Sequence, residues 1–132
     1  MRILIVEDNP DHAEIIRRVL EERKATDEVS WVVDGGDALD YIERCQINHT
    51  PFPDLLLLDI KLIQMDGDKV LETLKKNEST KGISVVMLTT SSYEGEMEHC
   101  YKLGASGYII KPLRFDEFRK KLSNLERYLS NN

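Results

Sequence analysis

The sequence predicts an α/β fold in which a five-stranded parallel sheet is doubly wound, with helices on both of its faces. The first observation is a stretch at residues 54–62 in which four consecutive leucines lead into Asp59. An apolar run this short, with Pro53 before it and Gly67 soon after it, is typical of a strand buried on both faces. The second observation is that short apolar runs alternate with amphipathic segments along the whole chain, as they do in parallel sheets.

Two pairs of strand and helix precede this central strand. Residues 2–6 form the first predicted strand. Asn9 can cap the next helix by accepting its free amide protons, and Pro10 fits the first helical position, which needs no amide proton. The second strand is expected at 29–33, before a glycine turn at 35–36. The apolar residues that mark these two helices are Ala13, Ile16, Val19 and Leu20 in the first, and Ala38, Leu39 and Ile42 in the second.

Three helices and two strands are expected after the central strand. The strands are predicted at 83–88 and 107–110. Ser91 with Glu94 fits a capping box at the start of the fourth helix, and Gly104 ends that helix. The last helix is expected to be continuous, because its apolar residues recur every three or four positions. The apolar residues of the third and last helices are Val70, Leu71 and Leu74, and Phe115, Phe118, Leu122, Leu125 and Leu129.

Length and composition indicate one domain over residues 1–132, with no output domain. The chain is 41% hydrophobic and 32% charged, and no apolar run approaches the roughly 18 residues that span a bilayer. Because the N-terminus lacks the features of a signal peptide, a cytoplasmic protein without membrane insertion is expected. A net charge of -6 argues against direct binding to nucleic acid, which needs a basic surface. Cys45 and Cys100 fall in helical segments and are expected to be buried thiols.

Functional side chains follow four of the five predicted strands. Glu7 and Asp8 follow the first, Asp59 the third, Thr89 the fourth and Lys111 the fifth. Because the carboxyl ends of parallel strands meet at one edge of the sheet, these side chains are expected to lie together. Two carboxylates about 4 Å apart repel by roughly 4 kcal/mol at an effective dielectric constant of 20, so the cluster needs a compensating cation. Mg²⁺ suits carboxylate and phosphate oxygens, which with the lysine indicates phosphoryl transfer to a carboxylate.

In this set of residues the chain closely resembles the receiver domains of two-component response regulators, the CheY-like family. The matching residues, in chain order, are Glu7-Asp8-Asn9-Pro10, Asp59, Asp66-Gly67, Thr89, Tyr108 and Lys111-Pro112. The resemblance covers nearly the whole chain and implies a flavodoxin-like sheet with the strand order 2-1-3-4-5. One departure is Ile63, which stands where the family usually has a proline that rigidifies the loop.

The resemblance also implies roles for the matching residues at the strand ends. Asp59 would be the phosphoacceptor, and Lys111 would contact the phosphoryl group. The Mg²⁺ ligands would be Glu7, Asp8, Asp59 and the backbone carbonyl of Lys61.

A second group of matching residues would act as a switch. Thr89 would turn its hydroxyl toward the phosphoryl group, and Tyr108 would be the switch aromatic. Tyr108 also suits an ordinary strand residue that packs on the fourth helix. The peptide bond between Lys111 and Pro112 would be cis.

These roles describe a signalling switch rather than an enzyme. The chain would accept a phosphoryl group from a sensor histidine kinase and signal to an unidentified downstream protein through the face of the fourth helix, fifth strand and fifth helix. The loop at 50–53 and the pair Lys61-Leu62 most resemble stand-alone regulators of phytochrome-type or hybrid kinases. Acidic residues on the fourth helix and basic residues on the fifth fit a homodimer and a solvated surface equally well. These residues are Glu94, Glu96 and Glu98, and Arg114, Arg119, Lys120 and Lys121.

Three other interpretations compete with this one. A phosphohydrolase of the haloacid dehalogenase type would also use Asp59 as a nucleophile, but Lys61 occupies the place of its second aspartate. A flavin-binding module needs a phosphate loop after the first strand, where Glu7 and Asp8 would repel a phosphate. A receiver that works by contact alone would not need the full set of charged residues. The histidines match no metal-ligand spacing and are expected to be surface or helix residues: His12, His49 and His99.

Overall fold

The structure is a computed structural model that describes residues 1–132 except 25, 63–64, 91–93, 113 and 130–132. Its parallel strands pair in the order β2-β1-β3-β4-β5, so the expected fold class and strand order are confirmed. The strands are β1 (Arg2–Val6), β2 (Glu28–Val32), β3 (Leu55–Asp59), β4 (Ser84–Thr89) and β5 (Gly107–Ile110). The helices are α1 (Pro10–Arg23), α2 (Gly35–Ile47), α3 (Gly67–Lys76), α4 (Glu94–Lys102) and α5 (Phe115–Lys121), followed by the 3-10 helix η1 (Leu125–Tyr128).

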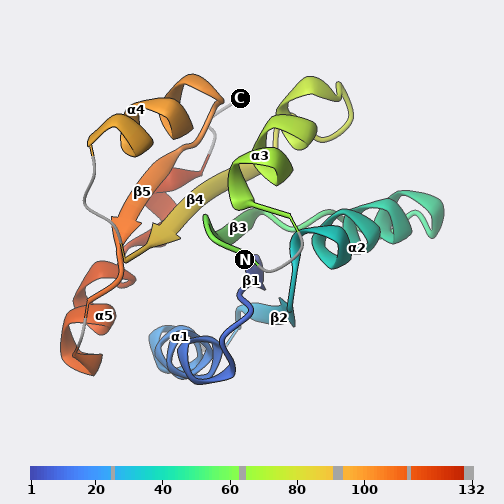
Figure 1. Ribbon diagram of the computed structural model, residues 1–132. Helices are drawn as coiled ribbons and strands as arrows, with labels where there is room; N and C mark the ends of the chain where they lie inside the picture. The colour runs from blue at the N-terminus through green and yellow to red at the C-terminus, as the bar shows by residue number, and fades with distance from the viewer. Residues whose placement is uncertain (25, 63–64, 91–93, 113, 130–132) are drawn as a thin grey trace.

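Two apolar cores lie on opposite faces of the sheet. Helices α1 and α5 cover one face, and α2, α3 and α4 cover the other (Figure 1). The four leucines of β3 serve both cores in alternation, because successive side chains of a strand point to opposite faces. Leu55 and Leu57 pack with α1 and α5, whereas Leu56 and Leu58 pack with α2 and α3. All four are fully buried, as expected for the central strand.

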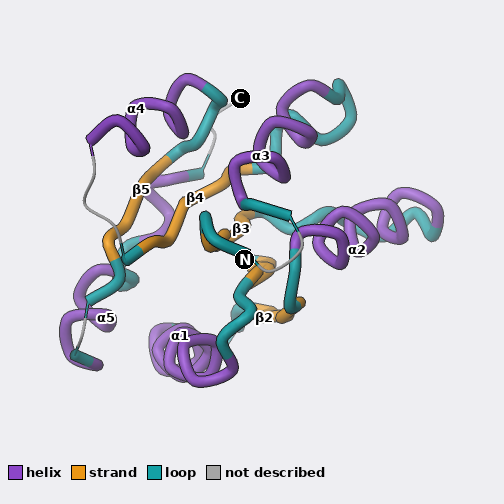
Figure 2. The backbone as a smooth tube through the Cα atoms, in the orientation of Figure 1, coloured by secondary structure: helices purple, strands orange, loops and turns teal. Residues whose placement is uncertain are grey.

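The order of elements places every strand-to-helix loop at the same edge of the sheet. Strands and helices alternate along the chain (Figure 2), and all strand pairs are parallel. At the first of these loops Asn9 caps α1 as expected: its Oδ1 accepts hydrogen bonds from the amides of Asp11, at 2.9 Å, and His12, at 3.2 Å. Pro10 is the first residue of that helix. The loop that carries the carboxylates after β1 therefore leads into a helix whose first residue is fixed by its cap.

The expectation of one continuous last helix is wrong. Helix α5 ends at Lys121, and the chain forms η1 after a break that contains Ser123 and Asn124. The Ser123 hydroxyl donates a 2.7 Å hydrogen bond to the Lys120 carbonyl, the kind of local contact that competes with helix continuation. Leu122 and Leu125 are still buried in one core with Phe118. The apolar spacing therefore identified the buried residues but not the helix end.

The ends of two strands and the burial of the two cysteines can also be compared with the sequence expectations. Strands β2 and β4 are each displaced by one residue from the ranges expected, which is within the usual uncertainty of element ends. Cys45 and Cys100 are buried free thiols, and burial raises the pKa of the Cys100 thiol to about 11. Ser91 and Ile63 are not among the residues that the structure describes. None of the described helices is long and apolar enough to cross a membrane.

Gly67 is required by the turn that returns the chain from β3 to α3. Its amide donates a 2.6 Å hydrogen bond to the Ile60 carbonyl. A Cβ atom at this position would overlap the backbone carbonyl of Asp59. The turn therefore brings the start of α3 against the end of β3, next to the carboxylate edge.

We expect Gly67→Ala to lower the free energy of unfolding by about 1–3 kcal/mol, because the backbone of Asp59 must move to admit the methyl group. The matched control is Gly82→Ala, since a Cβ atom at Gly82 meets nothing within 4 Å. The control should stay within about 0.5 kcal/mol of wild type. Urea unfolding of both variants measures the difference, and equal stabilities would contradict this account of the turn.

Candidate functional site

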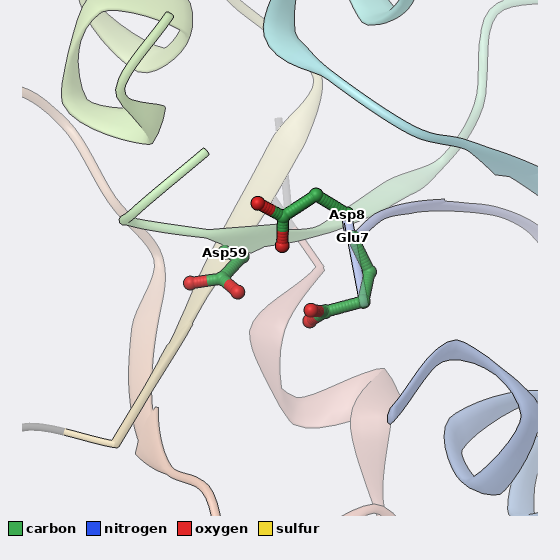
Figure 3. Close-up of side chains that lie close together, drawn as sticks. All are labelled: Glu7, Asp8 and Asp59. Carbon is green, nitrogen blue, oxygen red and sulfur yellow. The ribbon is translucent and has the colours of Figure 1, made fainter. Parts of the chain in front are cut away.

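Three carboxylates converge at the carboxyl edge of the sheet. Glu7 and Asp8 come from the loop after β1, and Asp59 is the last residue of β3 (Figure 3). One carboxylate oxygen from each residue lies within 4.8 Å of those from the other two. Glu7 is 1% exposed and Asp59 is 9% exposed, so neither charge is fully hydrated. Such a group requires positive charge nearby.

Lys111 supplies that charge from the end of β5. Its Nζ donates hydrogen bonds to Glu7 Oε2, at 2.5 Å, and to Asp59 Oδ2, at 2.9 Å. The lysine is itself buried, and its backbone amide donates to the Thr89 carbonyl at 2.6 Å. The expected cis bond between Lys111 and Pro112 is wrong: no cis peptide bond occurs in the described chain, and trans is the isomer that X-Pro bonds favour.

Glu7 is the carboxyl most altered by this environment. Burial raises the pKa of Glu7 to about 7, against the opposing effects of the hydrogen bond and positive charge of Lys111. Asp59 adds a smaller repulsion that acts in the same direction as burial. The Oε1 atom of Glu7 accepts a 3.2 Å hydrogen bond from the Asn9 amide. Burial therefore disfavours the charged form of Glu7. A cation bound nearby would favour the charged form and lower this pKa again.

The carboxylates open into a pocket of about 180 Å³ at this edge. Its lining is oxygen-rich, and hard oxygen donors from carboxylates are the ligands preferred by Mg²⁺ and Mn²⁺. The residues present therefore fit a divalent cation. Lys61 lines the same pocket, and its amide donates a 3.1 Å hydrogen bond to Asp59 Oδ1. The other lining residues are Asn9, His12, Thr89, Thr90 and Lys111.

Thr89 and Tyr108 meet at a third side chain, Glu96 of α4. The Tyr108 hydroxyl donates to Glu96 Oε1 at 3.1 Å, and the Thr89 hydroxyl donates to the same oxygen at 3.4 Å. Burial and the hydrogen bond to Glu96 raise the pKa of Tyr108 to about 12. Thr89 is 3% exposed and lines the carboxylate pocket, whereas Tyr108 does not line it. One carboxylate on α4 thus joins both residues.

Two residues of this region were not expected from the sequence. His12 lies on a helix, as expected, but its Nδ1 is 3.2 Å from Lys111 Nζ and 3.7 Å from Glu7 Oε1. Burial and the charge of Lys111 lower the pKa of His12. Glu96 was expected only as a surface charge. Each contacts side chains from other elements or loops, so the periodicity of its own helix does not mark it.

The remaining histidines agree with the expectation that they are surface or helix residues. His49 is exposed, and the ring of His99 on α4 lies 3.3 Å from Asp68 on α3.

Comparison with known proteins gives a consistent match. Residues 3–123 match the family model described as the response regulator receiver domain. A probable methanogenesis regulatory protein, FilR2 of Methanothrix harundinacea, is 36% identical over 126 residues, which cover 96% of this chain and 81% of that protein. Response regulator Rcp1 of Synechocystis is 31% identical over 127 residues, covering 96% and 86%.

Solved structures show the same similarity. The Mn²⁺-bound form of Rcp1 superposes with a TM-score of 0.84 at 30% identity, covering 99% of this chain and 96% of the other. The phosphorylated cyanobacterial phytochrome response regulator RcpA gives a TM-score of 0.87 at 32% identity, covering 97% and 92%. The first is similar in fold to this chain and binds a divalent cation, and the second is phosphorylated.

We expect Asp59→Asn to raise stability in the absence of divalent cations. Three carboxylates face one ammonium, so removing one of them relieves repulsion worth about 1 kcal/mol, or about 3–5 °C in melting temperature. Mn²⁺ should stabilise wild type more than the variant, by RT ln(1 + [L]/Kd). The control is Asp40→Asn, an exposed carboxylate of α2. Thermal unfolding with EDTA and with Mn²⁺ tests this, and identical behaviour of the two variants would mean that the carboxylates are not coupled.

Proposed function

The chain belongs to the response regulator receiver domain family, and on that premise we propose that it is a phosphorylation switch that uses Asp59 as its phosphoacceptor. It receives a phosphoryl group from a sensor histidine kinase in the presence of Mg²⁺. It then signals by contact with a downstream protein. The single observation that carries the proposal is the contact of Lys111 Nζ with Asp59 inside the oxygen-lined pocket.

The transfer requires a nucleophile, a route for the phosphoryl group and neutralisation of charge. An oxygen of Asp59 attacks the phosphorus, an O–P bond forms, and the N–P bond to the kinase histidine breaks with its electron pair left on nitrogen. The Nζ of Lys111 donates a hydrogen bond to Asp59 Oδ2, and from this position it can contact a phosphoryl oxygen after the transfer. The Lys61 amide orients the other carboxylate oxygen. Mg²⁺, when bound, would neutralise phosphoryl oxygens, and Glu7, Asp8, Asp59 and the Lys61 carbonyl would hold it.

The change of state in this proposal is a competition for two hydroxyl groups. In the unphosphorylated chain Thr89 and Tyr108 are hydrogen-bonded to Glu96. A phosphoryl oxygen on Asp59 would attract the Thr89 hydroxyl, which lines the same pocket. Tyr108 can then follow, and the surface of α4, β5 and α5 changes. The proposal thus assigns the switch to Thr89 and Tyr108.

The identity of the kinase is inferred from similarity alone. RcpA is a cyanobacterial phytochrome response regulator, and a bacteriophytochrome response regulator, RtBRR, superposes at 35% identity. We therefore propose a phytochrome-type or hybrid histidine kinase as the phosphodonor. Membership of the receiver family replaces the alternative of a haloacid dehalogenase type phosphohydrolase, for which Lys61 was already an unsuitable residue.

Treatment with acetyl phosphate should add one phosphoryl group to Asp59 when Mg²⁺ is present and none when EDTA removes it. Intact-mass spectrometry measures the adduct. Asp59→Asn should abolish labelling, whereas Asp40→Asn should leave it unchanged. Equal labelling of wild type and Asp59→Asn would assign the phosphoacceptor elsewhere.

Glu96→Ala should favour the phosphorylated state. The substitution removes the acceptor shared by Thr89 and Tyr108, and the loss of a hydrogen bond to a charged group should tighten beryllium fluoride binding about 5-fold to 10-fold. Glu98→Ala is the control, since Glu98 is an exposed carboxylate on the same helix. If both variants bind beryllium fluoride as wild type does, Glu96 does not hold the switch.

Self-association upon phosphorylation remains a prediction. Fewer charged side chains are available for it than the sequence implied, because some of them contact residues of the same chain. Glu94 and Glu98 are exposed on α4, but Glu96 is engaged with Thr89 and Tyr108. On α5, Arg119 contacts Glu22 of α1 at 3.1 Å, and the Nζ of Lys121 donates a 3.4 Å hydrogen bond to the Ile110 carbonyl. Lys120 is exposed on the same helix.

A two-fold dimer would pair α4 of one subunit with α5 of the other. Sedimentation with and without beryllium fluoride should detect it, and Lys120→Glu should weaken it. A monomer under both conditions identifies these charges as a solvated surface.

A further inference from the structure

The loop that carries Glu7 and Asp8 is attached to the edge strand β2 by two hydrogen bonds. The Glu7 amide donates to the Val32 carbonyl at 3.1 Å, which extends the parallel ladder by one residue. The Glu7 carbonyl in turn accepts a 2.8 Å hydrogen bond from Nε1 of Trp31. Trp31 is the only tryptophan in the sequence. A side chain, not the backbone, thus holds the carbonyl that leads into Asp8.

This carbonyl belongs to the peptide unit that joins two of the three clustered carboxylate residues. Because a peptide unit is planar, the positions of its oxygen and of the Asp8 Cα atom are fixed together. Rotation of the plane would therefore move Asp8 relative to Glu7 and Asp59. The donor on Trp31 restrains that rotation from outside the pocket.

The restraint matters most for Asp8. The Glu7 carboxylate is held by Lys111 and by the Asn9 amide, and the Asp59 carboxylate is held by Lys111 and by the Lys61 amide. In contrast, the Asp8 carboxylate takes part in no hydrogen bond with another described residue. Its place is set by its backbone, and that backbone is oriented by the peptide unit that Trp31 binds.

Packing alone is a weak explanation for a tryptophan at this position. Trp31 is 43% exposed on an edge strand, so a large part of this residue gains nothing from burial. The directed contact of a tryptophan is its Nε1 donor, and here that donor is used on Glu7. We propose that Trp31 is a positioning residue for the divalent cation site, which it orders through the Glu7–Asp8 peptide unit. This inference rests on the proposed cation site and adds a residue from outside it.

The test compares Mn²⁺ affinity in variants that separate the hydrogen bond from the ring. Trp31→Phe keeps an aromatic ring without a donor. Because the sequence has one tryptophan, uniform replacement by benzothienylalanine, in which sulfur takes the place of the N–H group, changes this position alone and keeps the ring size. The control is Val33→Ala, which shortens another exposed apolar side chain close to β2. Isothermal titration with Mn²⁺ and the melting temperature in EDTA are measured for each protein.

Both Trp31 variants should bind Mn²⁺ about 10-fold more weakly than wild type, the loss typical when a contact that orients a metal ligand is removed. The benzothienylalanine protein should melt in EDTA as wild type does, which distinguishes positioning from general destabilisation. Val33→Ala should bind as wild type does. Wild-type affinity in the benzothienylalanine protein would overturn the role of Trp31 while leaving the cation site intact. No Mn²⁺ binding by wild type would overturn the cation site itself, and this inference with it.

Discussion

The ammonium of Lys111 is the interaction on which the carboxyl edge of the sheet depends. It joins β5 to Glu7 after β1 and to Asp59 on β3, and all three residues are buried. Burying ionised groups costs several kcal/mol for each ion, and only close pairing offsets that cost. The parallel strand order makes the pairing possible, because it brings three strand ends that are far apart in sequence to one place. The arrangement of Glu7 and Asp59 in the pocket therefore depends on one lysine.

The negative charge of the carboxylates exceeds the positive charge of Lys111, and this excess makes the site suitable for a cation. Three carboxylates lie together, one ammonium contacts two of them, and the pKa of Glu7 rises to about 7 because burial outweighs the contribution of Lys111. A site so arranged gains from a divalent cation and resists an anion that arrives without one. The same imbalance is acceptable to the fold because the surrounding core is strong: every leucine of β3 is fully buried beneath Asp59. Stability is concentrated in the strands, and the unsatisfied charge is confined to their ends.

Sequence patterns sufficed for features that depend on one element at a time. The leucines before Asp59, the cap at Asn9 and the carboxyl-edge positions of Thr89 and Lys111 all follow from local runs and from the parallel topology. The break after Lys121 was missed because apolar spacing continues across it, while Ser123 ends the helix by a local hydrogen bond. His12, Glu96 and Trp31 were missed for a different reason. Each acts on a residue of another element, and side-chain contacts between elements leave no periodic signal in a single sequence.

In the proposed switch, Glu96 is the side chain whose contacts distinguish the two states. Its carboxylate holds the hydroxyls of Thr89 and Tyr108 on one oxygen, at the start of the surface formed by α4 and β5. A phosphoryl group on Asp59 can change that surface only if it binds the Thr89 hydroxyl more strongly than Glu96 does, since a ligand shifts an equilibrium by its difference in affinity for the two states. Both acceptors are anionic, so the hydrogen bonds they offer are similar in kind. The positive charge near each acceptor then decides which of them binds the Thr89 hydroxyl more strongly. In this chain Lys111 contacts Asp59 and would therefore favour the phosphoryl group over Glu96.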